Sequence, residues 1–151
     1  MVIADSGFWL ALSNAKDLHH SRALAWLDVL QEALITTWPV VTETCHLLVR
    51  RTGLESQHRF LESYREGAFK TFALEHRHAS RITTLMRKYS DLPMDLADAS
   101  LVILAEHLGH GRILSTDRRD FHAYRWKERR PFHNLLVEEP PPAGQPYFAR
   151  R

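Results

Sequence analysis

The feature of this sequence that most constrains its fold is the alternation of short apolar runs with longer segments of helical periodicity. The runs at 2–4 (VIA), 34–38 (LITTW) and 112–116 (RILST) are shorter than typical helices but suit buried strands. Between such runs, apolar residues recur at helical spacing, as over 18–34 and 76–89. Strands that alternate with helices indicate a parallel sheet covered by helices on both faces. The predicted fold class is therefore α/β.

The rest of the chain adds elements of the same two kinds. Further helices are expected at 8–13, 39–52, 55–65 and 94–109, and further strands at 69–74 and 134–137. A chain of 151 residues suits one domain of ordinary size, and we place that domain at 1–137. The remaining segment, 138–151, is rich in proline, and we predict that it forms a flexible tail.

Composition narrows the classes of function and the compartment. The net charge of +2 does not by itself identify a nucleic-acid-binding protein. The single cysteine, Cys45, excludes an intrachain disulfide and fits a reducing compartment. No apolar stretch approaches the roughly 18 residues of a membrane span, and the N-terminal MVIAD does not resemble a secretory signal. We therefore expect a cytoplasmic protein with no membrane partner.

Two aspartates follow short apolar strands directly. Asp5 comes after the first strand and is followed by Ser6, and Asp117 comes after the strand at 112–116, which ends in Thr116. In an open parallel sheet, ligands bind beyond the carboxyl ends of the strands. If the two strands are neighbours, we expect both carboxylates to lie at that edge.

Three more acids lie near the starts of predicted helices, which the fold brings to the same edge of the sheet. Glu43 is in the first turns of the helix that Pro39 opens, and Asp95 and Asp98 share one face at the head of an apolar helix. Clustered carboxylates raise one another's pKa values and cost stability unless a cation neutralises them. Mg²⁺ prefers oxygen ligands, and one or two such ions can promote attack of water on a phosphodiester.

Each acid taken alone also has an ordinary structural explanation. Asp5 and Asp117 suit turns after strands, and Glu43 suits a solvent-exposed helix surface. A helix dipole favours acids in the first turn, which is the explanation that we prefer for Asp95. Asp98 lies further into an apolar helix, where an unpaired charge is costly, so a functional site is the better interpretation there. A metal site is predicted from the set of acids, not from any single one.

The order strand-Asp, helix-Glu, helix-Asp, strand-Asp resembles the PIN-domain family, in particular the VapC-like toxin ribonucleases of type II toxin–antitoxin pairs. The segments that carry the resemblance are VIADSGFWLALSNAKDLHH, TWPVVTETCHLLVRR, DLPMDLADASLVILAEHLG and RILSTDRRDF. The resemblance implies a three-layer αβα PIN-like fold with a mostly parallel central sheet. It implies an endoribonuclease that uses one or two Mg²⁺ or Mn²⁺ ions to activate water against RNA. It also implies a homodimer and a cognate antitoxin protein.

The resemblance also assigns roles to individual residues. The metal ligands and catalytic groups that it implies are Asp5, Glu43, Asp98 and Asp117. Ser6 and Thr116 match small polar residues that support the metal ligands, and Asp95 belongs to a frequent variant of the third motif. Arg118 and Arg119, beside the last acid, are candidates for contacts with RNA phosphates.

Three points remain open from the sequence. Asp120 is a second candidate beside Asp117 for the last acidic position. A non-catalytic PIN-like domain that binds RNA or protein is the alternative function, although the presence of all four acids argues against it. A phosphatase of the haloacid-dehalogenase type with Asp5 as nucleophile is less favoured, because that chemistry requires a second aspartate where Gly7 stands.

Overall fold

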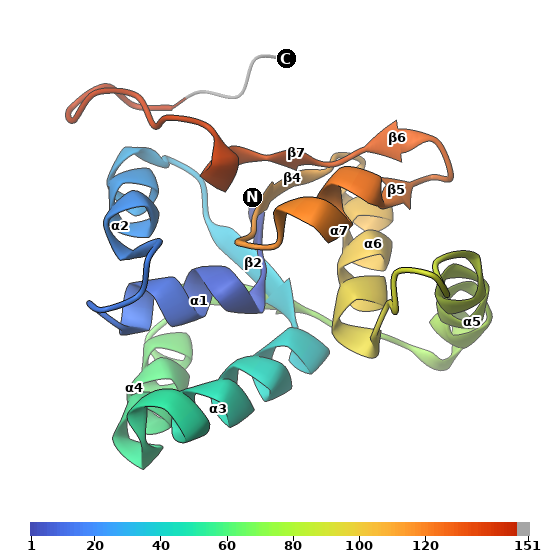
Figure 1. Ribbon diagram of the computed structural model, residues 1–151, viewed down its shortest axis with the longest axis horizontal. Helices are drawn as coiled ribbons and strands as arrows, with labels where there is room; N and C mark the ends of the chain where they lie inside the picture. The colour runs from blue at the N-terminus through green and yellow to red at the C-terminus, as the bar shows by residue number, and fades with distance from the viewer. Residues whose placement is uncertain (148–151) are drawn as a thin grey trace.

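Five short strands form one sheet at the centre of the computed structural model, which describes residues 1–147 (Figure 1). The strands are β1 (Val2–Ala4), β2 (Leu34–Thr37), β3 (Phe69–Phe72), β4 (Arg112–Leu114) and β7 (His133–Asn134). Their order across the sheet is β3-β2-β1-β4-β7, and every neighbouring pair is parallel. The predicted parallel sheet is therefore confirmed, and β1 and β4 are neighbours, as the convergence of Asp5 and Asp117 requires.

Helices cover both faces of this sheet and complete three layers (Figure 1). One face carries α1 (Ser6–Ser13), α2 (His20–Val29), α3 (Trp38–Thr52) and α4 (Leu54–Arg65). The other face carries α5 (Ala79–Lys88), α6 (Leu96–Leu108) and α7 (Arg118–Ala123). Two 3-10 turns, η1 (His76–His78) and η2 (Leu135–Val137), and a small hairpin of β5 (Arg125–Trp126) and β6 (Arg130–Pro131) complete the described elements.

The core explains why α6 is apolar on nearly every side. Its residues 99–105 are all buried, and they pack against β1 and β2 on one side and α5 on the other. Removing this much apolar surface from water is the main stabilising contribution to such a fold. Asp95 caps the helix by accepting a hydrogen bond from the Asp98 backbone N–H at 2.8 Å. The helix thus brings Asp98 to the sheet's carboxyl edge at the boundary of the core.

The structure differs from the sequence expectation in the last part of the chain. The strand predicted at 134–137 is wrong, because only His133 and Asn134 pair with β4 and the 3-10 turn η2 follows. The Asn134 side chain accepts a hydrogen bond from the Leu136 N–H, which turns the chain away from the sheet. The short helix α7 was not predicted, since six residues are too few to show a helical period.

The proline-rich segment after residue 137 lies along α2 as far as Tyr147. The Trp26 indole N–H donates to the Glu138 carbonyl at 3.2 Å, and the Tyr147 N–H donates to the Val29 carbonyl at 2.9 Å. The rings of Trp26 and Tyr147 meet edge to face, with centroids 5.2 Å apart. The flexibility predicted for this tail stays a prediction, and its last four residues, 148–151, lie outside the described residues. Within residues 1–147, no helix is both long enough and apolar enough to cross a membrane.

At the amino edge of the sheet, opposite Asp5, Glu32 forms hydrogen bonds that link three parts of the chain. Its carboxylate accepts hydrogen bonds from both terminal guanidinium nitrogens of Arg112 and from the N-terminal amine of Met1, at 2.7 Å for the amine. The hydrogen bonds from Arg112 are the main reason that the pKa of Glu32 falls to about 2. The charged form of Glu32 therefore holds the starts of β1 and β4 beside the segment that leads into β2.

We predict that Glu32→Gln destabilises the protein by about 1–3 kcal/mol at neutral pH. This is the usual contribution to stability, about 1–3 kcal/mol, of hydrogen bonds to a charged group that is partly exposed. Because the pKa is lowered on folding, this stabilisation is complete above the unfolded value of about 4.5 and disappears as the pH falls towards 2. Urea unfolding of both proteins at several pH values measures it. An equal difference at pH 7 and pH 2 would contradict an ionic origin.

Candidate active site

The carboxyl edge of the sheet opens onto an acidic cavity of about 310 Å³. The polar residues that line it are Asp5, Ser6, Asp17, Glu43, Arg51, Asp95, Asp98, Thr116, Asp117 and Asp120. All four acids proposed as ligands from the sequence line this cavity, and so do the supporting residues Ser6, Thr116 and Asp95. The structure therefore brings together side chains from β1, α3, α6 and the end of β4.

Asp5 is fixed on both sides of its carboxylate. One oxygen accepts a hydrogen bond from the Ser6 N–H at 2.7 Å, which caps α1, and the other accepts from the Ser115 hydroxyl at 2.7 Å. Only 6% of Asp5 is exposed, and desolvation raises its pKa to about 6 against the opposing effect of these hydrogen bonds. The nearby charges of Asp117 and Asp95 raise the pKa further.

One hydroxyl links Asp5 to Asp117. Ser115 donates to Asp5 and accepts a hydrogen bond from the Asp117 N–H at 3.0 Å. Asp117 in turn caps α7 by accepting from the Asp120 N–H at 3.0 Å, and burial raises the pKa of its carboxyl. Asp120 also reaches the cavity, but its carboxylate pairs with Arg119 at 3.1 Å. Asp117 is therefore the better-placed of these two acids for a ligand, because it shares Ser115 with Asp5.

Asp98 lies in the first turn of α6, where its carboxylate accepts a hydrogen bond from the Tyr124 hydroxyl at 3.0 Å. Desolvation raises the pKa of Asp98 to about 8, and the charges of Asp95, Asp5 and Glu43 add to the effect. Burial and the charge of Asp98 likewise raise the pKa of Tyr124, so its hydroxyl stays a donor. This pair keeps a carboxyl group oriented at the cavity wall in a place where its charge is poorly solvated.

Glu43 completes the set from the opposite wall, on the first turns of α3. Desolvation raises its pKa to about 7, the charges of Asp95 and Asp5 raise it further, and a side-chain hydrogen bond with Ser6 lowers it. Four carboxyls with raised pKa values, those of Asp5, Glu43, Asp98 and Asp117, thus line one small cavity. Each would be relieved of the same electrostatic penalty by a cation placed among them.

The donor set fits a hard divalent cation in its chemistry. Carboxylate and hydroxyl oxygens are the ligands that Mg²⁺ prefers, and Mg²⁺ is usually bound through one or two carboxylates while it keeps several waters. Across residues 1–147, no three His, Cys, Asp or Glu side chains are already gathered tightly enough to form a metal cluster. The carboxylates therefore line one cavity without forming a preassembled cluster of three ligands.

Gly7, directly after Ser6, also shapes the wall. A Cβ at this position would overlap the Thr116 hydroxyl oxygen, so a side chain here would displace Thr116. The phosphatase alternative required an aspartate at this position. The close approach of the Thr116 side chain to the Gly7 backbone explains instead why glycine stands there.

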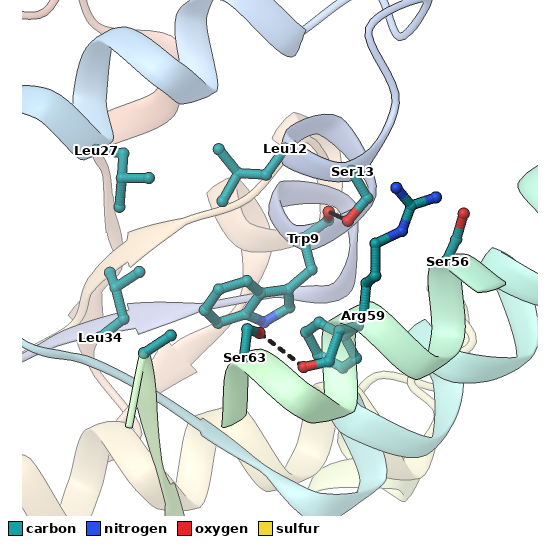
Figure 2. Close-up of a pocket in the computed structure, with 10 residues that line it drawn as sticks. Trp9, Leu12, Ser13, Leu27, Leu34, Ser56, Arg59 and Ser63 are labelled. Atoms are coloured by element: carbon teal, nitrogen blue, oxygen red, sulfur yellow. Dashed lines mark hydrogen bonds between the residues drawn. The ribbon is translucent and has the colours of Figure 1, made fainter. Parts of the chain in front are cut away.

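A second cavity of about 420 Å³ lies between α1, α2 and α4 and shares no lining residue with the acidic one. Figure 2 shows the indole of Trp9 in this cavity, with Leu12 and Leu34 on one side and Arg59 and Ser63 of α4 on the other. Trp9 is 5% exposed, and its indole N–H has no hydrogen-bond partner within residues 1–147. No acidic residue lines this cavity, so it is not a candidate for the metal-binding site.

A PIN-domain family model matches residues 2–127, a stretch that contains every acid of the cavity. This chain belongs to the PIN-domain family. It is also similar to Ribonuclease VapC26 of Mycobacterium tuberculosis, with 32% identity over 127 residues that cover 82% of this chain and 92% of that protein. The crystal structure of Mycobacterium tuberculosis VapC20, a sarcin-ricin loop cleaving toxin, superimposes with a TM-score of 0.76 at 21% identity. That match covers 87% of this chain and 100% of the other, and it supports the three-layer fold.

Two residues that form hydrogen bonds with the acids of the cavity were not expected from the sequence. Ser115 lies inside the strand predicted at 112–116, and the sequence assigns the supporting hydroxyl to Thr116, yet Ser115 contacts both Asp5 and the Asp117 backbone. Tyr124 lies beyond the recognised motifs and reaches Asp98 across 26 positions of sequence. Ser115 lies two residues before Asp117, but the sequence does not indicate which of Ser115 and Thr116 contacts Asp5. The sequence likewise offers no signal for Tyr124.

The two arginines proposed as phosphate contacts lie outside the acidic cavity of this PIN domain. Arg119 pairs with Asp120 and is exposed on the first turn of α7. Arg118 lines a neighbouring hollow of about 480 Å³ together with His122, Phe132 and His133. Arg51 of α3 lines the acidic cavity itself.

Proposed function

We propose that this PIN-domain protein is a metal-dependent endoribonuclease that hydrolyses RNA phosphodiester bonds in the cytoplasm. The observation that carries the proposal is the convergence of Asp5, Glu43, Asp98 and Asp117 on one cavity. These acids come from four separate parts of the chain, and the desolvation of Asp5, Glu43 and Asp98 is costly without a counter-charge. A ribonuclease name on a relative with 32% identity supports the same reaction.

The four acids would hold one or two Mg²⁺ or Mn²⁺ ions. Such an ion supplies a Lewis acid for a phosphate oxygen and lowers the pKa of bound water. The protein's own residues orient the ligands: Ser115 holds Asp5, Tyr124 holds Asp98, and Ser6 contacts Glu43. Thr116 and Asp95 line the same cavity, and Asp95 also fixes the start of α6.

Arginines near the cavity supply contacts for the negatively charged backbone of RNA. Arg51 reaches the cavity wall, and we propose that Arg118 and Arg119 bind phosphates further along the strand, beside α7. Such contacts are independent of sequence and weaken as salt is added. They position the RNA, while the acids act at the scissile phosphate.

The biological role that we propose is that of a toxin, silenced by a cognate antitoxin protein, with the nuclease acting as a homodimer. The description of VapC20 as a toxin supports this role. Analytical ultracentrifugation of the purified chain tests the dimer. Co-expression with the protein encoded by the neighbouring reading frame tests the antitoxin, which should form a stable complex and inhibit cleavage.

The decisive test of the enzyme is cleavage of structured RNA and of total RNA with Mg²⁺, with Mn²⁺ and with chelator. We expect cleavage with either metal and none in chelator, and we expect Asp5→Asn to be inactive. The matched control is Asp28→Asn, which removes an exposed acid of α2 outside the cavity. RNA that is bound equally well with and without metal, and never cut, would instead favour the non-catalytic binding domain.

We predict that Tyr124→Phe impairs cleavage by weakening the hold on Asp98. The ring and its packing are kept, while the 3.0 Å hydrogen bond to the carboxylate is lost. Removing a group that orients a metal ligand typically costs about 10–100-fold in metal affinity. The Mg²⁺ concentration for half-maximal cleavage should therefore rise by about tenfold or more, with a smaller change at saturating metal. An unchanged Mg²⁺ dependence would mean that Tyr124 only packs.

A further inference from the structure

A broad hollow of about 600 Å³ lies directly beside the acidic cavity. It is formed where the first turns of α3 and α6 meet, and its walls include Trp38, His46, Leu96 and Ala97. Glu43 and Asp95 line both spaces, so the hollow and the acidic cavity are neighbours. A molecule that reaches the carboxylates can therefore extend into this hollow.

Trp38 gives the hollow a large aromatic wall that is 49% exposed. Its ring meets Tyr64 edge to face, with centroids 5.5 Å apart and planes at 88°. Tyr64 is itself held by a hydrogen bond between its hydroxyl and that of Thr71 at 2.8 Å. The indole is thus supported from one side by a fixed neighbour, yet half of its surface meets solvent. Leu96, on the facing helix, is 47% exposed in the same hollow.

The charges around this hollow select against phosphate. None of the residues that line it in the described structure is lysine or arginine, whereas Glu43 and Asp95 both carry carboxyl groups. An RNA phosphate would be repelled by those acids unless it lay at the metal ligands. An uncharged planar base would not be repelled, and it would cover apolar surface on Trp38 and Leu96 that now faces water.

We propose that Trp38 is a stacking platform for an unpaired nucleobase of the RNA, next to the phosphate held at the carboxylates. This inference rests on the proposed nuclease function and adds a binding residue to it. Bases stack on exposed aromatic rings with little dependence on sequence. Because a base paired within a helix does not offer its face, the RNA must be single-stranded or opened where Trp38 binds it.

The test measures RNA binding separately from cleavage. The full chain carrying Asp98→Asn, in Mg²⁺, is titrated with a labelled single-stranded RNA of mixed sequence and with an abasic ribose-phosphate strand of equal length. Trp38→Ala and Trp38→Phe are each added to this parent. We expect Trp38→Ala to weaken binding of the RNA by about tenfold and to leave the abasic strand unaffected, as loss of one base stack requires. Trp38→Phe should retain most of the affinity.

Three outcomes would overturn the stacking platform. These are no loss of RNA binding in Trp38→Ala, an equal loss on the abasic strand, and no binding of either strand by the parent protein. Sedimentation of each variant identifies a further contrary case, in which Trp38→Ala dissociates a dimer and weakens both strands alike, because Trp38 would then be a subunit contact. Failure of the unmodified chain to cleave RNA in Mg²⁺ would count against the nuclease proposal instead, since the binding comparison does not depend on cleavage.

Discussion

Asp98→Asn should abolish RNA cleavage and at the same time stabilise the metal-free protein. Asparagine keeps the shape of the side chain and can still accept the Tyr124 hydrogen bond, but it lacks the negative charge with which a carboxylate binds and neutralises Mg²⁺. Loss of a group that stabilises charge in the reacting complex costs about 100–1,000-fold in rate. Gel-based cleavage of RNA in Mg²⁺ measures this loss.

The same substitution should increase folding stability, although it removes activity. Folding places Asp98 where burial and neighbouring acids raise its pKa to about 8, so ionised Asp98 favours the unfolded chain at neutral pH. Replacing it with a neutral side chain removes that penalty, and we expect the metal-free protein to gain about 1 kcal/mol or more, or a few degrees in Tm. Thermal unfolding in chelator measures the gain.

Asp28→Asn is the matched control for both measurements, because Asp28 is exposed on α2 and lies outside the cavity. It should leave the cleavage rate and the Tm unchanged. Normal cleavage by Asp98→Asn would remove Asp98 from the catalytic set. A Tm lowered by several degrees would show instead that the Asp98 carboxylate is a structural group.

Much of this arrangement could be predicted because a parallel sheet imposes it. Residues that directly follow short apolar strands, such as Asp5 and Asp117, must lie at the carboxyl edge, and neighbouring strands bring them together. Asp98 could be predicted because an acid near the start of a helix that is otherwise buried conflicts with its surroundings. These inferences need only the period and order of the elements.

The contacts that tune the acids could not be predicted in this way. Ser115 and Asp5 are 110 positions apart, and nothing in a strand of three residues indicates which following hydroxyl points at Asp5. Tyr124 follows α7, which is too short to reveal itself by periodicity. The sequence also does not indicate that Arg119 pairs with Asp120 and lies outside the acidic cavity.

The second large effect expected is the stabilisation of the unmodified protein by divalent cations. A ligand that binds only the folded state stabilises it by about 2.7 kcal/mol at 100 times its Kd, which corresponds to roughly 5–10 °C in Tm for a chain of this size. Mg²⁺ or Mn²⁺ added to metal-free protein should therefore raise the Tm in a saturable manner. Mn²⁺ should act at lower concentration if the ions follow the usual order of affinity for such ligands.

The variants separate binding at the acidic cavity from a general effect of salt. Asp98→Asn and Asp5→Asn should each start from a Tm at or above that of the unmodified protein in chelator, and each should respond weakly to metal, because one ligand is missing. Asp28→Asn should respond as the unmodified protein does. An equal rise in Tm for all of these proteins, or for NaCl at matched ionic strength, would contradict a cation site at these carboxylates. In that case the raised pKa values of Asp5, Glu43 and Asp98 would be a stability cost that no metal relieves.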